Sequence, residues 1–186
     1  KEIYPAGFST RVDPPTSAQP WEGAHRPHHF SGVVTVVSKL FNIIPADVVF
    51  FGQKDYQQAM VIQQLVSDLN FPIQIEICPI VRNQDGLALS SRNQYLDPDQ
   101  RKQATVLSRC LQWAQQRVSE AERSTRTLTK GIREQLREAG VEAVDYVAIV
   151  DPATLVEVEQ VTEPARLLLA VQFGDIRLID NCCLIP

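Results

Sequence analysis

The sequence lacks long apolar runs and any excess of positive charge. Its longest apolar candidate, residues 167–171, is far shorter than the roughly 20 residues that a membrane-spanning helix needs. The 18 Lys and Arg residues against 22 Asp and Glu residues give a formal net charge of −4, which provides no global field to hold nucleic acid or an acidic membrane. We therefore expect neither nucleic acid nor a membrane as a partner.

Cysteines are also scarce. Four of them are too few for a disulfide scaffold, and they lack the Cys-x-x-Cys spacing of a zinc site. Cys182 and Cys183 are neighbours, and a bridge between them would strain the intervening peptide, so we predict free thiols and a reducing, cytoplasmic location. The chain does not open on a methionine or a signal peptide, and we expect that residues once preceded Lys1.

Residues 31–80 alternate between helix and strand signals. The expected elements cover residues 31–45, 47–51, 55–70 and 73–80. Ser31 can cap the first helix, and residues 47–51 form an apolar run without alternation, which is typical of a strand buried on both faces of a parallel sheet. Because two strands are too few for a stable open sheet, further strands must come from upstream of Lys1, from another chain or from the C-terminal half.

The character of the sequence changes after Val81. Asp85-Gly86 is a turn signal, and Asp97 followed by Pro98 is typical of a helix start. The expected elements are two helices and then three strands, over residues 98–122, 128–139, 143–150, 166–173 and 176–180. We predict a mainly antiparallel sheet packed on these helices, in a second domain over residues 81–186.

One candidate site follows the strand predicted at residues 47–51. That strand ends at Gly52, where a ligand can approach the backbone, and the next helix begins at once with Lys54 and Asp55. Helix-start amides and the Lys54 ammonium favour phosphate, while Asp55 can accept hydrogen bonds from ribose hydroxyls. Gln58 projects from the same helix face. The alternative is a surface turn in which Asp55 only caps the helix.

A second candidate site is the segment with Ser90, Ser91 and Arg92. Two hydroxyls beside an arginine can bind several phosphate oxygens, which suggests a pyrophosphate clamp. The alternative is an ordinary polar loop before the helix at Asp97.

All three histidines lie in residues 22–30. We do not predict a metal site there, because Pro27 disrupts helical ligand spacing and all three ligands would come from one short loop. Arg26 and His29 are better placed to stabilise an anion or to close the mouth of a site. A polar loop with capping residues is the alternative.

Two stretches and the chain's ending carry an ordered set of motifs. They read EGAHRPHHFSGVVTVVSKLFNIIPADVVFFGQKDYQQ, PIVRNQDGLALSSRNQYLD and GDIRLIDN. In this order they closely resemble the pantothenate synthetase (pantoate-beta-alanine ligase) family over essentially the whole chain. The resemblance implies an α/β fold: the remainder of a Rossmann-type nucleotidylyltransferase-like domain with parallel strands over residues 1–80, and a smaller α+β domain with an antiparallel sheet over residues 81–186 that closes over ATP.

The resemblance also implies an activity and site residues. The family activates pantoate with ATP as pantoyl adenylate and then joins it to beta-alanine, with Mg²⁺ accompanying the nucleotide in a homodimer. The implied ATP-binding residues are Gly52, Gln53, Lys54, Asp55, Val81, Leu89, Ser90, Ser91 and Arg92. Of these, Lys54, Ser90, Ser91 and Arg92 are implied to be catalytic. Gln58 matches a pantoate-binding glutamine, and Arg26 and His29 lie in a further matched site loop.

The family's first strand, its paired-histidine phosphate motif and a second pantoate-binding glutamine have no match in these residues. We therefore expect the chain alone to bind nucleotide weakly and to catalyse poorly or not at all. Two alternatives stay open, namely a non-catalytic nucleotide-binding or assembly module and a related enzyme that adenylates another carboxylic acid. The enzymatic interpretation requires Lys54 and Arg92 to converge on one triphosphate.

Overall fold

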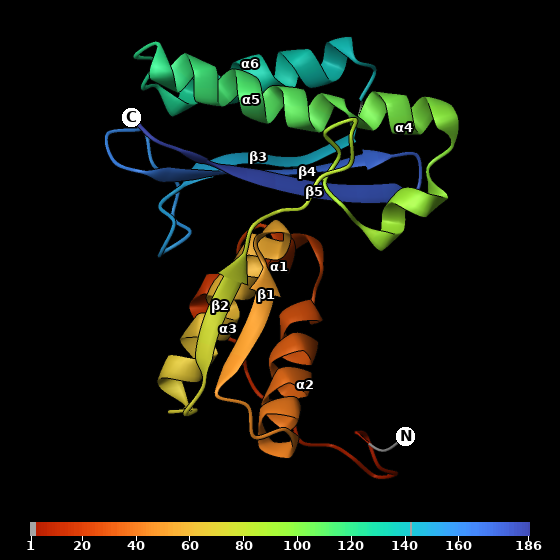
Figure 1. Cartoon of the computed structure of the whole chain (residues 1–186), viewed down its shortest axis with the longest axis vertical. Helices are drawn as coiled ribbons and strands as arrows, with labels where there is room; N and C mark the ends of the chain where they lie inside the picture. Colours follow the sequence, from red (N-terminus) through yellow and green to blue (C-terminus); the bar gives the residue numbers. More distant parts are fainter. Residues whose placement is uncertain (1–2, 142) are drawn as a thin grey trace. The chain divides into compact units, whose positions relative to one another are not determined.

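The structure, a computed structural model, describes residues 3–141 and 143–186. The expectation about the opening of the chain at Lys1 and Glu2 falls outside the described residues. Two separate sheets, one parallel and one antiparallel, confirm the α/β fold class with an antiparallel C-terminal part (Figure 1). None of the helices among the described residues is long and apolar enough to cross a membrane.

The chain divides into two compact units, residues 1–79 and 80–186. The elements of the first unit are η1 (Thr16–Ala18), α1 (Glu22–His25), α2 (His29–Ile43), β1 (Val48–Gly52), η2 (Gln53–Asp55), α3 (Tyr56–Asp68) and β2 (Gln74–Cys78). Strands β1 and β2 pair in parallel, with Gly52 opposite Cys78, and α3 is the crossover that parallel pairing requires. Helices α2 and α3 share one apolar cluster, against which Phe51 and Ile75 of the sheet pack.

Within residues 3–141 and 143–186, only one face of the parallel sheet is packed, so the prediction that β1 is buried on both faces is wrong for these residues. Phe51 points into the helix cluster, whereas Phe50, on the opposite face, is 67% exposed. Among the described residues of the first unit, both α2 and α3 pack on the face that carries Phe51 and Ile75. The C-terminal strands form a sheet of their own, which also excludes them as the neighbours of β1 and β2.

Helix α2 begins earlier than expected and without the predicted cap. Its first residue is His29, and His28 takes the N-cap position in the left-handed region, with φ of 65° and no side-chain cap. Ser31 lies inside the first turn, and its hydroxyl donates to the Val12 carbonyl at 3.4 Å. This serine therefore fastens the preceding loop to the helix rather than starting the helix.

The second unit places its helices on one face of the antiparallel sheet (Figure 1). Its elements are η3 (Ser91–Tyr95), α4 (Pro98–Ala104), α5 (Val106–Ser119), α6 (Thr125–Glu138), β3 (Ala143–Val150), β4 (Ala165–Phe173) and β5 (Ile176–Leu184), with the sheet order β3-β4-β5. The predicted start at Asp97 is confirmed, since its carboxylate accepts from Gln100 N at 2.8 Å in a capping box. The single helix predicted from residue 98 is two helices, which meet at Thr105.

Two of the four free thiols lie in the core of the second unit. Burial raises the pKa of Cys110 to about 11 and, with a smaller contribution from the Asp180 carboxylate, that of Cys182 to about 12. Cys78 in the first unit is exposed. The prediction of free thiols is confirmed, and their environments predict very different reactivities.

Alkylation with iodoacetamide at pH 8 should therefore modify Cys78 first and leave Cys110 and Cys182 intact in the folded chain. A thiol pKa raised by two units leaves about a hundredfold less thiolate, and burial further blocks the reagent. Peptide mass spectrometry after timed quenching measures the rates. In urea all cysteines should react alike, and native modification of Cys110 as fast as Cys78 would contradict the packing described.

Candidate functional site

Strand β1 ends in an open position at Gly52. Its φ of −76° is available to any residue, and a Cβ built there would meet no atom within 4 Å. Neither the backbone conformation nor the packing of the described residues therefore requires glycine. What the glycine provides is an uncovered backbone at the end of a parallel strand, where α/β sheets bind ligands.

Lys54 and Asp55 follow this strand end in η2. The Lys54 ammonium lies 3.5 Å from the Asp55 carboxylate, and the two side chains are 15% and 48% exposed. Asp55 occupies the N-cap position of α3, but its side chain accepts no hydrogen bond from the helix. The capping role in the alternative is therefore wrong, while a surface turn without a ligand stays an alternative. A half-exposed carboxylate beside a mostly buried ammonium can still accept hydrogen bonds from a ligand.

The buried amide of Gln57 fastens a distant loop to α3. Its Nε2 donates to the carbonyls of Ser17 at 2.9 Å and Pro20 at 2.8 Å, and its Oε1 accepts from Glu22 N at 2.9 Å. The sequence pattern pointed to Gln58 instead, and this role of Gln57 was missed. The i, i+4 spacing of Gln57 with buried Val61 was the signal that placed it on the inner face of the helix.

Arg26 and His29, predicted to form a site loop, do lie together. Arg26 Nη1 is 3.2 Å from His29 Nε2 and 3.7 Å from Oε2 of buried Glu22. A guanidinium only donates, so a hydrogen bond between these two groups uses Nε2 of His29 as the acceptor. Since Glu22 is held by Gln57, the loop is connected to the helix that follows Lys54 and Asp55.

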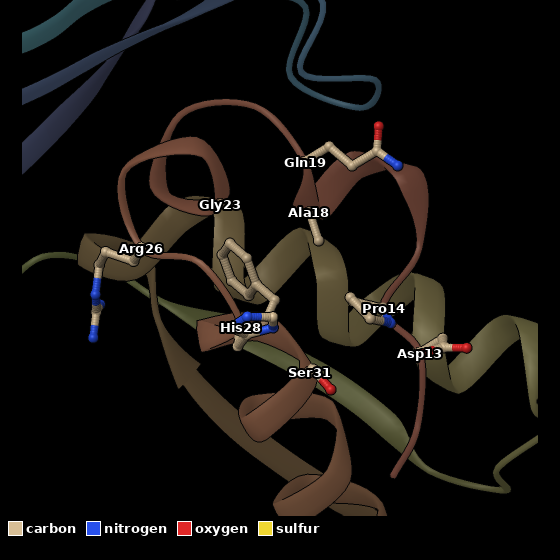
Figure 2. Close-up of a pocket in the computed structure, with 9 residues that line it drawn as sticks. Asp13, Pro14, Ala18, Gln19, Gly23, Arg26, His28 and Ser31 are labelled. Atoms are coloured by element: carbon tan, nitrogen blue, oxygen red, sulfur yellow. The ribbon is translucent and has the colours of Figure 1, made fainter.

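A pocket of about 510 Å³ lies under this loop (Figure 2). Its wall includes the polar side chains of Asp13, Arg26, His28 and Ser31. Figure 2 shows the Arg26 side chain extending away from the side on which Asp13 and Ser31 lie. The volume suits a small organic ligand, and the lining offers both donors and acceptors.

In the second unit, two predicted ATP contacts, Val81 and Leu89, lie at the two ends of one hairpin, residues 81–89. Leu89 N donates to the Val81 carbonyl and Asn83 N to the Leu87 carbonyl, both at 2.9 Å. The predicted turn is confirmed at Gly86, which has φ of 83° and whose Cβ would lie 2.7 Å from Ser108 Oγ. In contrast to Gly52, this glycine is required by the fold itself.

The predicted phosphate-binding residues Ser90, Ser91 and Arg92, here called the phosphate loop, continue directly from the hairpin. Ser90 is the N-cap of η3, and its Oγ accepts from Arg92 N at 3.3 Å. Leu89, Ser91 and Arg92 are exposed, so the Ser91 hydroxyl and the Arg92 guanidinium lie on the surface of the unit. The local backbone is thus ordered by hydrogen bonds while the guanidinium and hydroxyl groups stay accessible to a ligand.

The structure thus brings the predicted residues together in two groups. Gly52, Gln53, Lys54, Asp55 and Gln58 belong to the first unit, and Val81, Leu89, Ser90, Ser91 and Arg92 belong to the second. The convergence of the Lys54 and Arg92 charges stays a prediction. Within residues 3–141 and 143–186, no three His, Cys, Asp or Glu side chains are arranged to hold a metal ion.

Comparisons with known proteins agree on one family. A family model described as pantoate-beta-alanine ligase matches residues 1–183. The pantothenate synthetase of Roseiflexus castenholzii is 50% identical over 183 residues, which are 98% of this chain and 66% of that protein. The pantothenate synthetase of Chloroflexus aggregans is 50% identical over 186 residues, which are 100% of this chain and 67% of that protein. The chain therefore spans about two thirds of the length of these relatives.

Solved structures agree as well. The pantothenate synthetase of Thermus thermophilus has a TM-score of 0.95 at 42% identity, covering 100% of this chain and 67% of that one. A pantoate-beta-alanine ligase of Francisella tularensis, complexed with beta-gamma ATP and beta-alanine, has a TM-score of 0.73 at 34% identity over 97% of this chain and 60% of that one. Both likenesses are close enough in sequence to bear on family and not on fold alone.

Replacing Gln57 by Glu should weaken folding. The substitution removes both amide donors and sets a carboxylate against the Ser17 and Pro20 carbonyls, which should lower the free energy of unfolding by about 1–3 kcal/mol. Gln58→Glu is the matched control, the same change on a partly exposed neighbour, and should alter stability by no more than about 0.5 kcal/mol. Urea unfolding followed by circular dichroism measures both variants. Equal losses of unfolding free energy would contradict the role of Gln57 in fastening the loop.

Proposed function

Because the chain belongs to the pantoate-beta-alanine ligase family, we propose that it forms the nucleotide- and pantoate-handling part of an ATP-dependent ligase that joins pantoate to beta-alanine. The proposed products are pantothenate, AMP and pyrophosphate. The observation that carries the proposal is the uncovered strand end at Gly52, followed at once by the Lys54–Asp55 pair. The ligands named for the Francisella tularensis relative, an ATP analogue and beta-alanine, support the same substrates here.

In the first proposed step, a carboxylate oxygen of pantoate attacks the α-phosphorus of ATP. The P–O bond to the β-phosphate breaks, pyrophosphate leaves with the electron pair, and pantoyl adenylate forms. Such a displacement needs little covalent help and much positive charge around the phosphate oxygens. Lys54 and Arg92 are proposed to supply that charge, the hydroxyls of Ser90 and Ser91 to donate hydrogen bonds, and Asp55 to accept from the ribose.

In the second proposed step, the amine of beta-alanine attacks the acyl carbon of the adenylate. The new C–N bond forms, the C–O bond to AMP breaks, and the amine loses a proton. Gln58 is proposed to hold pantoate, and Gln53, Val81 and Leu89 to contact ATP. Ordering of the exposed loop around Arg92 on the nucleotide would exclude water from the acyl adenylate, which otherwise hydrolyses.

Magnesium is proposed to accompany the nucleotide. No carboxylate cluster among the described residues fits the ion, so we assign it no protein ligand and expect phosphate oxygens and water to hold it. Bound in this way, the ion would neutralise charge on the triphosphate. A homodimer and a cytoplasmic location are part of the same proposal.

Pantoate-dependent exchange of labelled pyrophosphate into ATP tests the first step. A chimera that carries residues 1–186 in place of the matched region of the Chloroflexus aggregans relative should catalyse it, whereas the 186 residues alone should show weak exchange or none. A folded chimera that binds ATP but exchanges with no acid would support the non-catalytic module. Exchange with another carboxylic acid only would support a related adenylating enzyme.

Substitution of Gly52 by Ala should separate binding from stability. A methyl group at this open position should leave the free energy of unfolding unchanged or raise it by up to about 1 kcal/mol, while it weakens Mg-ATP binding about tenfold. Gly32→Ala in α2, where a Cβ also meets no atom within 4 Å, is the matched control and should not affect binding. NMR titration of amide shifts detects even weak binding, and unchanged affinity in Gly52→Ala would contradict the site.

A further inference from the structure

A bidentate ion pair joins the hairpin of residues 81–89 to β5, the last strand of the antiparallel sheet. Arg82 Nη1 and Nη2 donate to the two carboxylate oxygens of Asp180 at 2.6 and 3.0 Å, across 98 residues of sequence. The Asp180 side chain is 1% exposed, and its Oδ1 also accepts from Asn181 N at 2.8 Å. Arg82 Nη1 donates in addition to the Gly86 carbonyl at 3.1 Å, so the same guanidinium holds the hairpin turn.

The ion pair lies beside Val81, one of the predicted ATP contacts. Successive side chains of an extended segment point to opposite sides, so Arg82 reaches β5 while Val81 is 64% exposed. The buried side chains of Leu87 and Ala88, in the returning arm, add an apolar anchor. The arm that carries Leu89 is therefore fixed on its inner side and free on its outer side.

A second fastening holds the phosphate loop to the hairpin. The Asn93 side chain is buried, and its Nδ2 donates to the Ala88 carbonyl at 2.9 Å, while its backbone amide donates to the Ser90 carbonyl at 3.1 Å. These bonds enclose Ser91 and Arg92 between two fixed points. The position of the exposed Arg92 backbone thus depends on the hairpin, and the hairpin depends on Asp180.

Stability alone does not account for a charged pair at this place. Well-packed apolar residues of similar volume often stabilise a fold as well as a buried ion pair does. A bidentate guanidinium–carboxylate pair additionally fixes an angle and a register. We propose that Arg82, Asp180 and Asn93 are positioning residues that set the orientation of the ATP-binding hairpin and phosphate loop, an inference that rests on the function proposed above.

Arg82→Lys is the test variant, because it keeps the charge and removes the fork. We expect it to fold, to exchange the Leu89 amide proton faster, and to bind Mg-ATP about tenfold more weakly, the factor that one charge-assisted hydrogen bond carries. Arg177→Lys is the matched control, since Arg177 Nε donates to Asp145 Oδ2 at 2.6 Å between β5 and β3. It should change neither readout. Equal Mg-ATP affinity in Arg82→Lys and the parent chain would overturn the proposal.

A double variant separates positioning from stability. Arg82→Met with Asp180→Leu replaces the pair by apolar side chains and should recover the unfolding midpoint without recovering nucleotide affinity. Recovery of both would mean that the pair is only structural and would overturn the proposal. If the parent chain itself shows no amide shifts with Mg-ATP at the hairpin, the proposed function fails instead. The exchange of the Leu89 amide proton is measured without nucleotide. Faster exchange in Arg82→Lys would therefore still establish that the ion pair anchors the hairpin.

Discussion

A buried polar side chain must find hydrogen-bond partners, and in each compact unit this requirement fixes the loop that carries the predicted ligand contacts. In the first unit the amide of Gln57 is satisfied only by backbone groups of the loop that leads to Arg26. In the second unit the carboxylate of Asp180 is satisfied by Arg82 and by Asn181 N. Both loops are irregular, and neither could be held in one conformation by apolar packing alone.

Local signals in the sequence were enough for most of the fold. The Asp97-Pro98 start and the Asp85-Gly86 turn depend on residues within one turn of each other, and both were predicted correctly. The exposure of Phe50 was not, because a run of apolar residues does not say whether one or two layers will cover a strand. The break at Thr105 also escaped prediction, since apolar spacing continues across it.

In the candidate site, too, some features depend on local sequence and others on partners far along the chain. Gly52 ends a strand, and Lys54 and Asp55 follow it within three residues, so their grouping could be predicted from the sequence. The partners of Gln57 lie 35 to 40 residues away and Arg82, the side-chain partner of Asp180, lies 98 residues away, beyond any local pattern. The grouping of the predicted ligand-contact residues therefore followed from local sequence, whereas the side chains that fasten the loops depend on partners far along the chain.

The open position at Gly52 differs from the enclosed one at Gly86, and the difference decides what a substitution at each glycine would change. A larger side chain at Gly86 would collide with Ser108 in a backbone conformation that disfavours it, so that site is governed by the need to fold. At Gly52 the same change would meet no atom of the described residues within 4 Å. A side chain added at Gly86 therefore acts on folding itself, whereas one added at Gly52 leaves the packing of the described residues unchanged and reports on whatever approaches that strand end from outside.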